Sequence, residues 1–271
     1  MPIDVMALAD VLRRAAKAEI LPRFRRLNLG DVRAKSEATD LVTEADVNAE
    51  RVIRAEIERI APQALFIGEE SVAADPVLLS KLKDAELAVI VDPVDGTFNF
   101  ASGIPAFGVM ASVVYRNETV AGIIYDPMGD DWVIAEKGSG AFLRRPDGEA
   151  MRLSVAEAKP LEAMIGMASA GYFFGEQREK ILGNLAKVRM FACYRCAAHE
   201  YRTLVGGHVD FVMYNKLMPW DHLAGTLIAQ EAGGHAARFD GSPYRPTDLE
   251  GGLLVASNPE SWRILRDEII A

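Results

Sequence analysis

The chain has 271 residues, 50% hydrophobic and 25% charged, a composition typical of a folded globular protein rather than a disordered or low-complexity one. Its net charge of −9 argues against binding to nucleic-acid backbones, and no apolar run approaches the roughly 18–20 residues of a membrane span. The first residues carry no signal-peptide pattern and two cysteines cannot make a disulfide framework, so we expect a cytoplasmic protein with neither nucleic acid nor membrane as partner.

The first half of the chain is predicted to form two helices followed by an antiparallel sheet. Apolar residues at helical spacing predict helices over residues 3–27, bent or ended near Pro22, and over residues 47–60. The polar segment 28–40 between them predicts a loop or a loose hairpin. Strands are then expected at residues 87–91, 107–115, 119–125, 132–136 and 141–143.

The second half alternates between strand and helix patterns. Strands are expected at residues 164–167, 211–214 and 253–256, and helices at 176–185, 220–231 and, capped by Asn258, to about 270. The turn-rich stretch 144–150 marks a boundary between an N-terminal αβ lobe, residues 1–146, and a C-terminal αβ lobe, residues 147–271. This order predicts a mixed α+β or α/β protein whose lobes stack into layers.

The most informative segment is Asp92-Pro93-Val94-Asp95-Gly96-Thr97, directly after a buried strand. Pro93 is expected to bend the chain so that Asp95 returns toward Asp92 across a turn. Two carboxylates this close repel one another unless a cation lies between them, and oxygen ligands suit Mg²⁺. A short helix beginning here would offer free N–H groups to a phosphate. An ordinary surface turn is the alternative.

Three further acidic segments have structural alternatives of their own. Glu69 and Glu70 follow a short apolar run, where an exposed loop is the simpler interpretation. Asp221 stands in the first turn of the most apolar helix, where it would compensate the helix dipole. Residues 40–46 precede the second helix, where a capping role is the default.

Together these segments resemble the inositol monophosphatase family of Mg²⁺-dependent phosphatases. The motifs that carry the resemblance, in the family's order, are Asp40-Leu41-Val42-Thr43 through Asp46, Gly68-Glu69-Glu70-Ser71, Asp92-Pro93-Val94-Asp95-Gly96-Thr97, and Trp220-Asp221 leading to Glu231-Ala232-Gly233-Gly234. The resemblance implies a layered αβαβα sandwich of the sugar-phosphatase type, a homodimer, and hydrolysis of phosphate monoesters of small polyols.

The resemblance also implies a role for each matching residue. The metal ligands would be Glu69, Asp92, the Val94 carbonyl, Asp95 and Asp221. Asp46, Glu69 and Thr97 would orient and activate the attacking water, with Glu70 beside its shell. Substrate contacts would come from Lys35, Asp95, Gly96, Thr97, Arg195, Ala197, Tyr214 and Asp221.

The implied mechanism is direct attack by a metal-activated water, because a Mg²⁺-loaded carboxylate cluster reverses the repulsion between a phosphate and the incoming oxygen. The sequence contains no aspartyl-phosphate or Cys-x5-Arg signature that would indicate a covalent route. Inhibition by Li⁺ is a further expectation from the family resemblance.

The substrate side departs from the inositol-specific pattern. Arg195-Cys196-Ala197-Ala198 stands where such members carry Gly-Ser/Thr-Ala-Ala, and Tyr214 stands where they place a glutamate that grips inositol hydroxyls. Arg195 would suit a second phosphate or a carboxylate. Histidinol phosphate, fructose 1,6-bisphosphate and a 3′-phosphorylated nucleotide are therefore alternative substrates, and a non-catalytic phosphate-ligand sensor is the alternative of another class.

Two smaller patterns stay open. Cys193, Cys196 and His199 have metal-ligand spacing but lack a nearby fourth ligand, and a packed entry to a helix over residues 197–205 is the favoured interpretation over zinc. His222 is adjacent to Asp221, where a structural role is favoured over a supporting role at the metal site.

Overall fold

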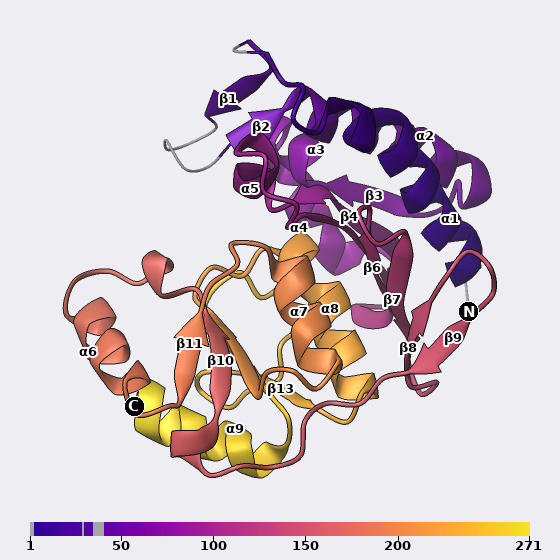
Figure 1. The fold of residues 1–271 in the computed structure, drawn as a ribbon. Helices are drawn as coiled ribbons and strands as arrows, with labels where there is room; N and C mark the ends of the chain where they lie inside the picture. The colour runs from indigo at the N-terminus through magenta and orange to yellow at the C-terminus, as the bar shows by residue number, and fades with distance from the viewer. Residues whose placement is uncertain (1–2, 29, 35–40) are drawn as a thin grey trace.

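The computed structural model describes residues 3–28, 30–34 and 41–271, which form five layers (Figure 1). Two N-terminal helices cover one face of a seven-stranded sheet, two helices separate this sheet from a five-stranded one, and two more helices cover the far face. The predicted αβαβα sandwich of mixed helices and sheets is confirmed.

The outer layer on the N-terminal side consists of α1 (Val5–Ala15) and α2 (Glu44–Ile60). Asp4 caps α1 by accepting the N–H groups of Met6 and Ala7, and helical turns continue from α1 to Arg23, so the predicted first helix is confirmed. The second helix begins three residues earlier than expected, because Thr43 caps it in a reciprocal pair with Asp46.

The seven-stranded sheet has the order β3-β4-β5-β6-β7-β8-β9 and is antiparallel except for the β3–β4 pair. The predicted hairpins are confirmed, and the expected boundary region lies at the turn between the last two strands. The strands are β3 (Leu65–Gly68), β4 (Leu87–Asp95), β5 (Gly108–Tyr115), β6 (Glu118–Asp126), β7 (Asp131–Glu136), β8 (Ala141–Arg144) and β9 (Ala150–Arg152).

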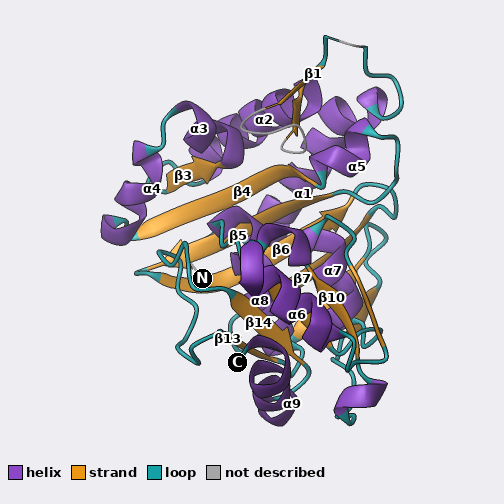
Figure 2. Ribbon diagram, turned by 90° about the vertical axis from the view of Figure 1, so that its left-hand side faces the viewer, coloured by secondary structure: helices purple, strands orange, loops and turns teal. Residues whose placement is uncertain are grey.

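The five-stranded sheet has the order β11-β10-β12-β14-β13, with β10 parallel to both of its neighbours. Three of its strands were predicted, whereas β11 and β13 were not. The strands are β10 (Ile165–Ala168), β11 (Met190–Ala192), β12 (Phe211–Tyr214), β13 (His235–Arg238) and β14 (Leu253–Ala256). Helices α6 (Gly175–Leu185) and α9 (Pro259–Leu265) cover its outer face, where Figure 2 shows α9 at the end of the molecule opposite α2.

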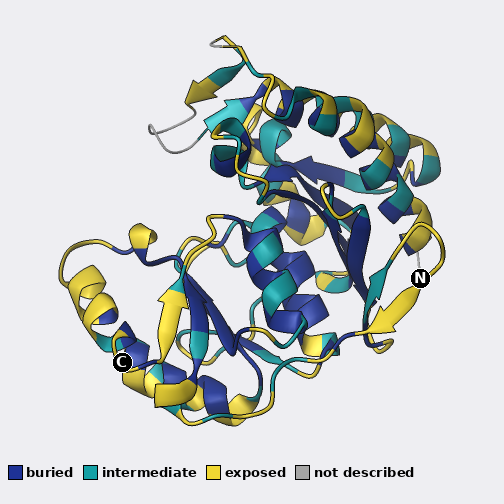
Figure 3. Ribbon diagram, in the orientation of Figure 1, coloured by how far each residue is buried: buried dark blue, intermediate teal, exposed yellow. Residues whose placement is uncertain are grey.

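The central layer consists of α7 (Ala197–Val205) and α8 (Pro219–Glu231). Nearly all of α8 is buried, since it is apolar on every side and lies between the two sheets (Figure 3). Gly122 on β6 allows the close approach, because a Cβ atom there would lie 2.6 Å from the carbonyl oxygen of Ala224. This packing fixes the N-terminus of α8 beside the large sheet.

Short elements complete the described part of the chain. The segment expected to be a loop or loose hairpin contributes a small antiparallel pair, β1 (Val32–Ala34) with β2 (Leu41–Thr43). The remaining α-helices of the described residues are short: α3 (Glu69–Ala74), α4 (Val77–Lys81) and α5 (Thr97–Ala101). Among the described residues, no helix combines the length and the apolar character needed to cross a bilayer.

Candidate active site

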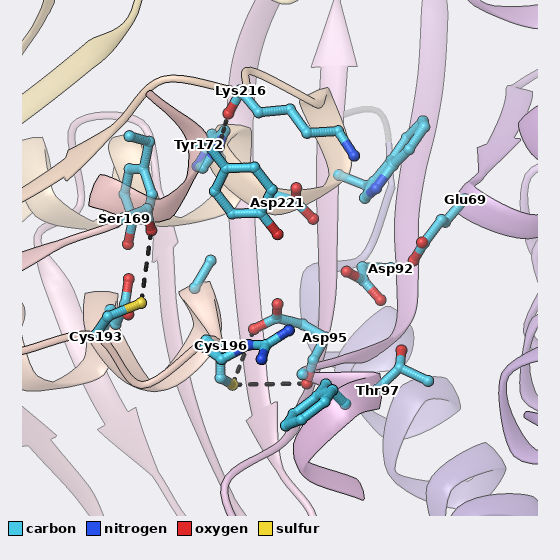
Figure 4. A pocket seen from close by; sticks show the side chains of 18 of the residues that line it. Glu69, Asp92, Asp95, Thr97, Ser169, Tyr172, Cys193, Cys196, Lys216 and Asp221 are labelled. Carbon is cyan, nitrogen blue, oxygen red and sulfur yellow. Dashed lines mark hydrogen bonds between the residues drawn. The ribbon is translucent and has the colours of Figure 1, made fainter. Parts of the chain in front are cut away.

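A cavity of about 460 Å³ opens where the two sheets face one another across the central helices. Its walls come from the end of β4, the first turns of α3, α5, α7 and α8, and the end of β12. Figure 4 shows acidic side chains from separate segments pointing into it, with Glu69 and Asp92 on one side and Asp221 on the other.

A β-bulge in β4 brings Asp92 and Asp95 to the same face. Asp92 pairs with Met110 of β5, but Asp95 pairs with Gly108, so that two residues of β4, Pro93 and Val94, lie opposite a single residue of β5. In a regular strand, residues three apart point to opposite faces; the extra residue reverses this for Asp95. The expected turn at Pro93 is therefore wrong. The chain stays in the strand, and Pro93, which has no N–H for the ladder, falls within the bulge.

Asp221 completes a compact acidic cluster. Oxygen atoms of Asp92, Asp95 and Asp221 all lie within 4.8 Å of one another. Burial raises the pKa of all three carboxyl groups, and repulsion from Glu69 and the neighbouring aspartates raises the pKa of Asp92 further. Clustered buried carboxylates are costly without a compensating cation.

The donor set fits a hard divalent ion. Every side chain in the cluster offers oxygen, and Asp92 is only 2% exposed. The Val94 carbonyl lies in the same bulge and accepts the hydroxyl of Thr97 (2.9 Å). Carboxylate and carbonyl oxygens are the ligands that Mg²⁺ prefers in proteins. Glu69, in the first turn of α3 rather than in an exposed loop, adds a further carboxylate to the wall.

The buried Asp46 is hydrogen-bonded to the half-buried Thr97, which lines the cavity. The Thr97 hydroxyl lies 2.9 Å from Asp46 Oδ1, whose other oxygen accepts the backbone N–H and hydroxyl of Thr43. Burial raises the pKa of Asp46 to about 6. The Asp46 side chain therefore both caps α2, as expected by default, and binds Thr97.

Gly96 connects the bulge to α5. Its φ of 87° is left-handed, and a Cβ atom would lie 2.8 Å from the Ala106 carbonyl oxygen, so only glycine fits without strain. The short helix considered from the sequence begins at Thr97, and its first residues line the cavity, where their backbone N–H groups have no partner within the helix.

Glu50 of α2 fixes the start of α3. Its carboxylate accepts the N–H groups of Glu70 (2.7 Å) and Ser71 (2.8 Å) as well as the Ser71 hydroxyl. A Cβ atom on Gly68 would lie 2.3 Å from this carboxylate, so the contact requires glycine before Glu69. The sequence analysis missed Glu50. The pattern that could have indicated it is a carboxylate on the otherwise apolar face of α2, three residues before Ile53.

We expect Glu50→Gln to weaken Mg²⁺ binding by about tenfold, the lower end of what a residue supporting a metal ligand contributes. The amide would turn a donor toward N–H groups that need an acceptor, and α3 with Glu69 would shift. Titration calorimetry with Mg²⁺ measures the effect. The matched control is Glu56→Gln on the same helix, where the side chain pairs at the surface with Arg14 and Arg59. Equal Mg²⁺ affinity in both variants would contradict the assignment.

The substrate-side residues predicted from the sequence also line the cavity. Arg195, Ala197 and Tyr214 all belong to its wall. Tyr214 is 4% exposed and lies against His222, with ring centroids 4.4 Å apart. The His222 ring donates to the Lys216 carbonyl and accepts from Tyr201, and burial lowers its pKa to about 4, so it is a neutral structural group.

Two charged residues of the wall were missed. Glu200 is 1% exposed and accepts the N–H of Tyr194; burial raises its pKa to about 7. The spacing of the residues could have indicated its burial, because Glu200 falls on the same buried face of α7 as Ala197 and Leu204. Lys216 follows β12, and its positive charge partly offsets the rise in the pKa of Asp221. A single lysine in a loop gives no comparable sequence signal.

Other predicted residues lie apart from the cavity or outside the description. Glu70 does not belong to the cavity wall, and Lys35 lies outside the described residues. The Cys193–His199 segment forms the predicted entry to α7. There, Cys196 Sγ donates to Asp95 Oδ2 (3.0 Å), and the His199 ring bonds the Phe107 carbonyl.

Comparison with known proteins gives concordant matches. The model of the inositol monophosphatase family matches residues 4–271. An inositol-1-monophosphatase of Rhizobium meliloti is 33% identical over 233 residues, which cover 85% of this chain and 83% of that protein. The Nus factor SuhB of Vibrio cholerae is 32% identical over 238 residues, 86% and 83% of the two chains. The solved structure of a Thermotoga maritima IMPase superposes with a TM-score of 0.79 at 27% identity, covering 97% of this chain and 93% of that one.

Proposed function

Because the chain belongs to the inositol monophosphatase family and is a phosphatase, we propose that it hydrolyses, with Mg²⁺, the phosphate monoester of a small polyol or sugar. The observation that carries the proposal is the convergence of Asp92, Asp95 and Asp221 on one cavity. A fold needs no such arrangement, and only a bound cation makes it inexpensive.

The residues that would hold the ions are Glu69, Asp92, Asp95, Asp221 and the Val94 carbonyl. Bound there, Mg²⁺ would neutralise the phosphate and favour deprotonation of a water molecule. The Gly96 and Thr97 amides would receive the phosphate oxygens at the start of α5.

Asp46, Glu69 and Thr97 would prepare the attacking water. The Thr97 hydroxyl has one hydrogen and two acceptors at 2.9 Å, Asp46 Oδ1 and the Val94 carbonyl. Above the Asp46 pKa of about 6 the carboxylate is the stronger acceptor, which leaves a Thr97 lone pair to accept from water. Glu69 would take the proton of that water. As its oxygen bonds to phosphorus, the ester P–O bond breaks and the departing alkoxide takes up a proton from solvent, so that the products are an alcohol and inorganic phosphate. Glu69 would then return its proton to solvent.

Several finer expectations belong to this proposal. Histidinol phosphate, fructose 1,6-bisphosphate and a 3′-phosphorylated nucleotide remain alternative substrates, and a homodimer and inhibition by Li⁺ follow from the family resemblance. One relative is named as a Nus factor, and a non-catalytic phosphate-ligand sensor is the alternative of another class. The intact acidic set favours the enzyme, because a sensor has no need for clustered carboxylates beside Thr97 and Asp46.

We expect phosphate release from at least one of inositol 1-phosphate, histidinol phosphate, fructose 1,6-bisphosphate and adenosine 3′,5′-bisphosphate. Removing metal with EDTA should lower the rate by at least about 10²-fold, since the charge stabilisation of the transition state is lost, and added Mg²⁺ should restore it. Adding Li⁺ to the restored enzyme should inhibit it. A rate that EDTA leaves unchanged would contradict metal dependence, and no release from any compound would favour the sensor.

A further inference from the structure

Arg195 holds a backbone conformation that costs an arginine more than it would cost a glycine. Its φ is 53°, in the left-handed region where a Cβ atom is strained. Four other non-glycine residues of the described chain share this feature, and Arg116, Asn117 and Asp130 among them lie in hairpin turns. Arg195 instead stands at the entry to α7 and lines the cavity. Strain kept at a cavity wall points to use of the side chain.

The Arg195 side chain is held in place by an aromatic ring of the same cavity. Its guanidinium carbon lies 3.7 Å from the ring centroid of Phe98, in the first turn of α5. Stacking occupies a face of the guanidinium, whereas the N–H donors lie in its plane and keep the fork geometry that matches a carboxylate or a phosphate. Phe98 therefore orients a cation beside the expected phosphate seat.

Two of the three clustered aspartates have nearby groups that partly offset their negative charge, although the pKa of each stays raised. The Asp95 carboxylate accepts from Cys196 Sγ and the Ala198 N–H, and these bonds are the main contacts that lower its pKa. Lys216 is the cation that lowers the pKa of Asp221, and Figure 4 shows its side chain extending over that end of the site. Neutralising the aspartates therefore does not explain the strained arginine.

The neighbouring wall changes in the same direction. Tyr214, nearly fully buried, stands where the inositol-specific pattern has a carboxylate that accepts hydroxyl groups, and Arg195 stands where that pattern has glycine. At these two positions the chain thus has one acid fewer and one base more than the inositol-specific pattern. Both changes favour an additional negative charge on the substrate.

We propose that Arg195, oriented by Phe98, makes this phosphatase select substrates that carry a second anionic group, a phosphate or a carboxylate, on the part that leaves as the alcohol. The inference rests on the proposed function, and it adds the substrate class. Arg195 acts as a specificity-determining residue: it binds the second anion and takes no part in transferring the proton or breaking the P–O bond.

The test compares kcat and KM for glycerol 2-phosphate, fructose 1,6-bisphosphate and 3-phosphoglycerate, which carry no second anion, a second phosphate and a carboxylate. In the Arg195→Gly variant we expect kcat/KM to fall by about 10- to 100-fold for either or both of the last two, mainly through KM, as for a lost hydrogen bond to a charged group. For glycerol 2-phosphate, which offers Arg195 no second anion, the loss should be smaller, so that the kcat/KM ratio of the second-anion compounds to glycerol 2-phosphate falls. The substrate whose kcat/KM falls shows whether the second anionic group is a phosphate or a carboxylate.

Two further variants separate the role of the side chain from effects on folding. Arg195→Gly relieves the left-handed strain, so its melting temperature should not fall. Arg195→Lys keeps the charge without the planar fork and should lose part of the preference. The matched control is Arg25→Gly, since Arg25 has a φ of 58° and lies 5.1 Å from the Phe24 centroid but lies outside the cavity wall. It should leave all three substrates unaffected.

Equal losses on all three substrates, or no loss on any, would overturn the inference. If the wild type releases no phosphate, the proposed function has failed, and titration calorimetry with the same three compounds then decides the inference separately. Tighter binding of fructose 1,6-bisphosphate or 3-phosphoglycerate than of glycerol 2-phosphate, lost in Arg195→Gly, would support it. Equal dissociation constants for all three compounds would overturn it.

Discussion

Replacing Asp92 with asparagine is expected to lower kcat by at least about 10²–10³-fold while the protein folds normally, because the variant loses the charge at the centre of the cation site. Asparagine has nearly the same shape, and its carbonyl oxygen can still accept the Val94 N–H that Asp92 accepts at 2.9 Å. Since repulsion and burial raise the Asp92 pKa, removing the charge should also stabilise the metal-free protein above neutral pH. Steady-state phosphate release and thermal unfolding in EDTA measure the two effects.

A second buried aspartate of the same sheet provides the control. Asp131 of β7 is 8% exposed and pairs with Arg202, away from the cavity. Asp131→Asn should lose stability, since it leaves the largely buried Arg202 with only the more distant carboxylate of Asp126 (3.8 Å), but should keep kcat. Asp92→Asn should therefore lose activity without losing stability, whereas Asp131→Asn should lose stability and keep its activity. Wild-type activity in Asp92→Asn would refute the metal site.

The second large effect concerns pH and metal together. Without Mg²⁺, we expect the folded protein to lose stability as pH rises from about 4.5 to 8. Asp46, with its pKa raised to about 6, binds protons more tightly in the folded than in the unfolded chain, and so does Glu200, at about 7. The protonated groups therefore make their full contribution to the free energy of unfolding below the pKa of the unfolded chain, near 4. This contribution is lost as the pH rises and each group ionises in the folded state. For Asp46 alone this loss is roughly 3 kcal/mol.

Mg²⁺ should reverse this loss, since it binds the ionised carboxylates of the folded state and competes with protons for them. The increase in melting temperature on adding Mg²⁺ should thus be larger at pH 8 than at pH 5. Thermal unfolding across this pH range, with EDTA or Mg²⁺, measures it, and Asp92→Asn should reduce the Mg²⁺ effect. An equal Mg²⁺ shift at both pH values would show that the cluster does not bind the ion.

Periodicity predicted the long elements well. The helix ending in Glu231 and the strands over residues 211–214 and 253–256 were found at or within one residue of their expected limits, because each buries a continuous apolar face that hydrophobic spacing reports directly. The unpredicted strands β11 and β13 are short, and neighbouring strands determine their conformation more than their own residues do.

The sequence by itself determined the family, the layered architecture and the set of acidic residues, since these depend on residue types and their order along the chain. Tertiary structure decided how the acids meet. The bulge that turns Asp95 to the face of Asp92, the Glu50 anchor of α3 and the strained Arg195 over Phe98 all depend on partners distant in the chain. No local pattern specifies such contacts, because the pairing register and the packing of distant segments are properties of the assembled core.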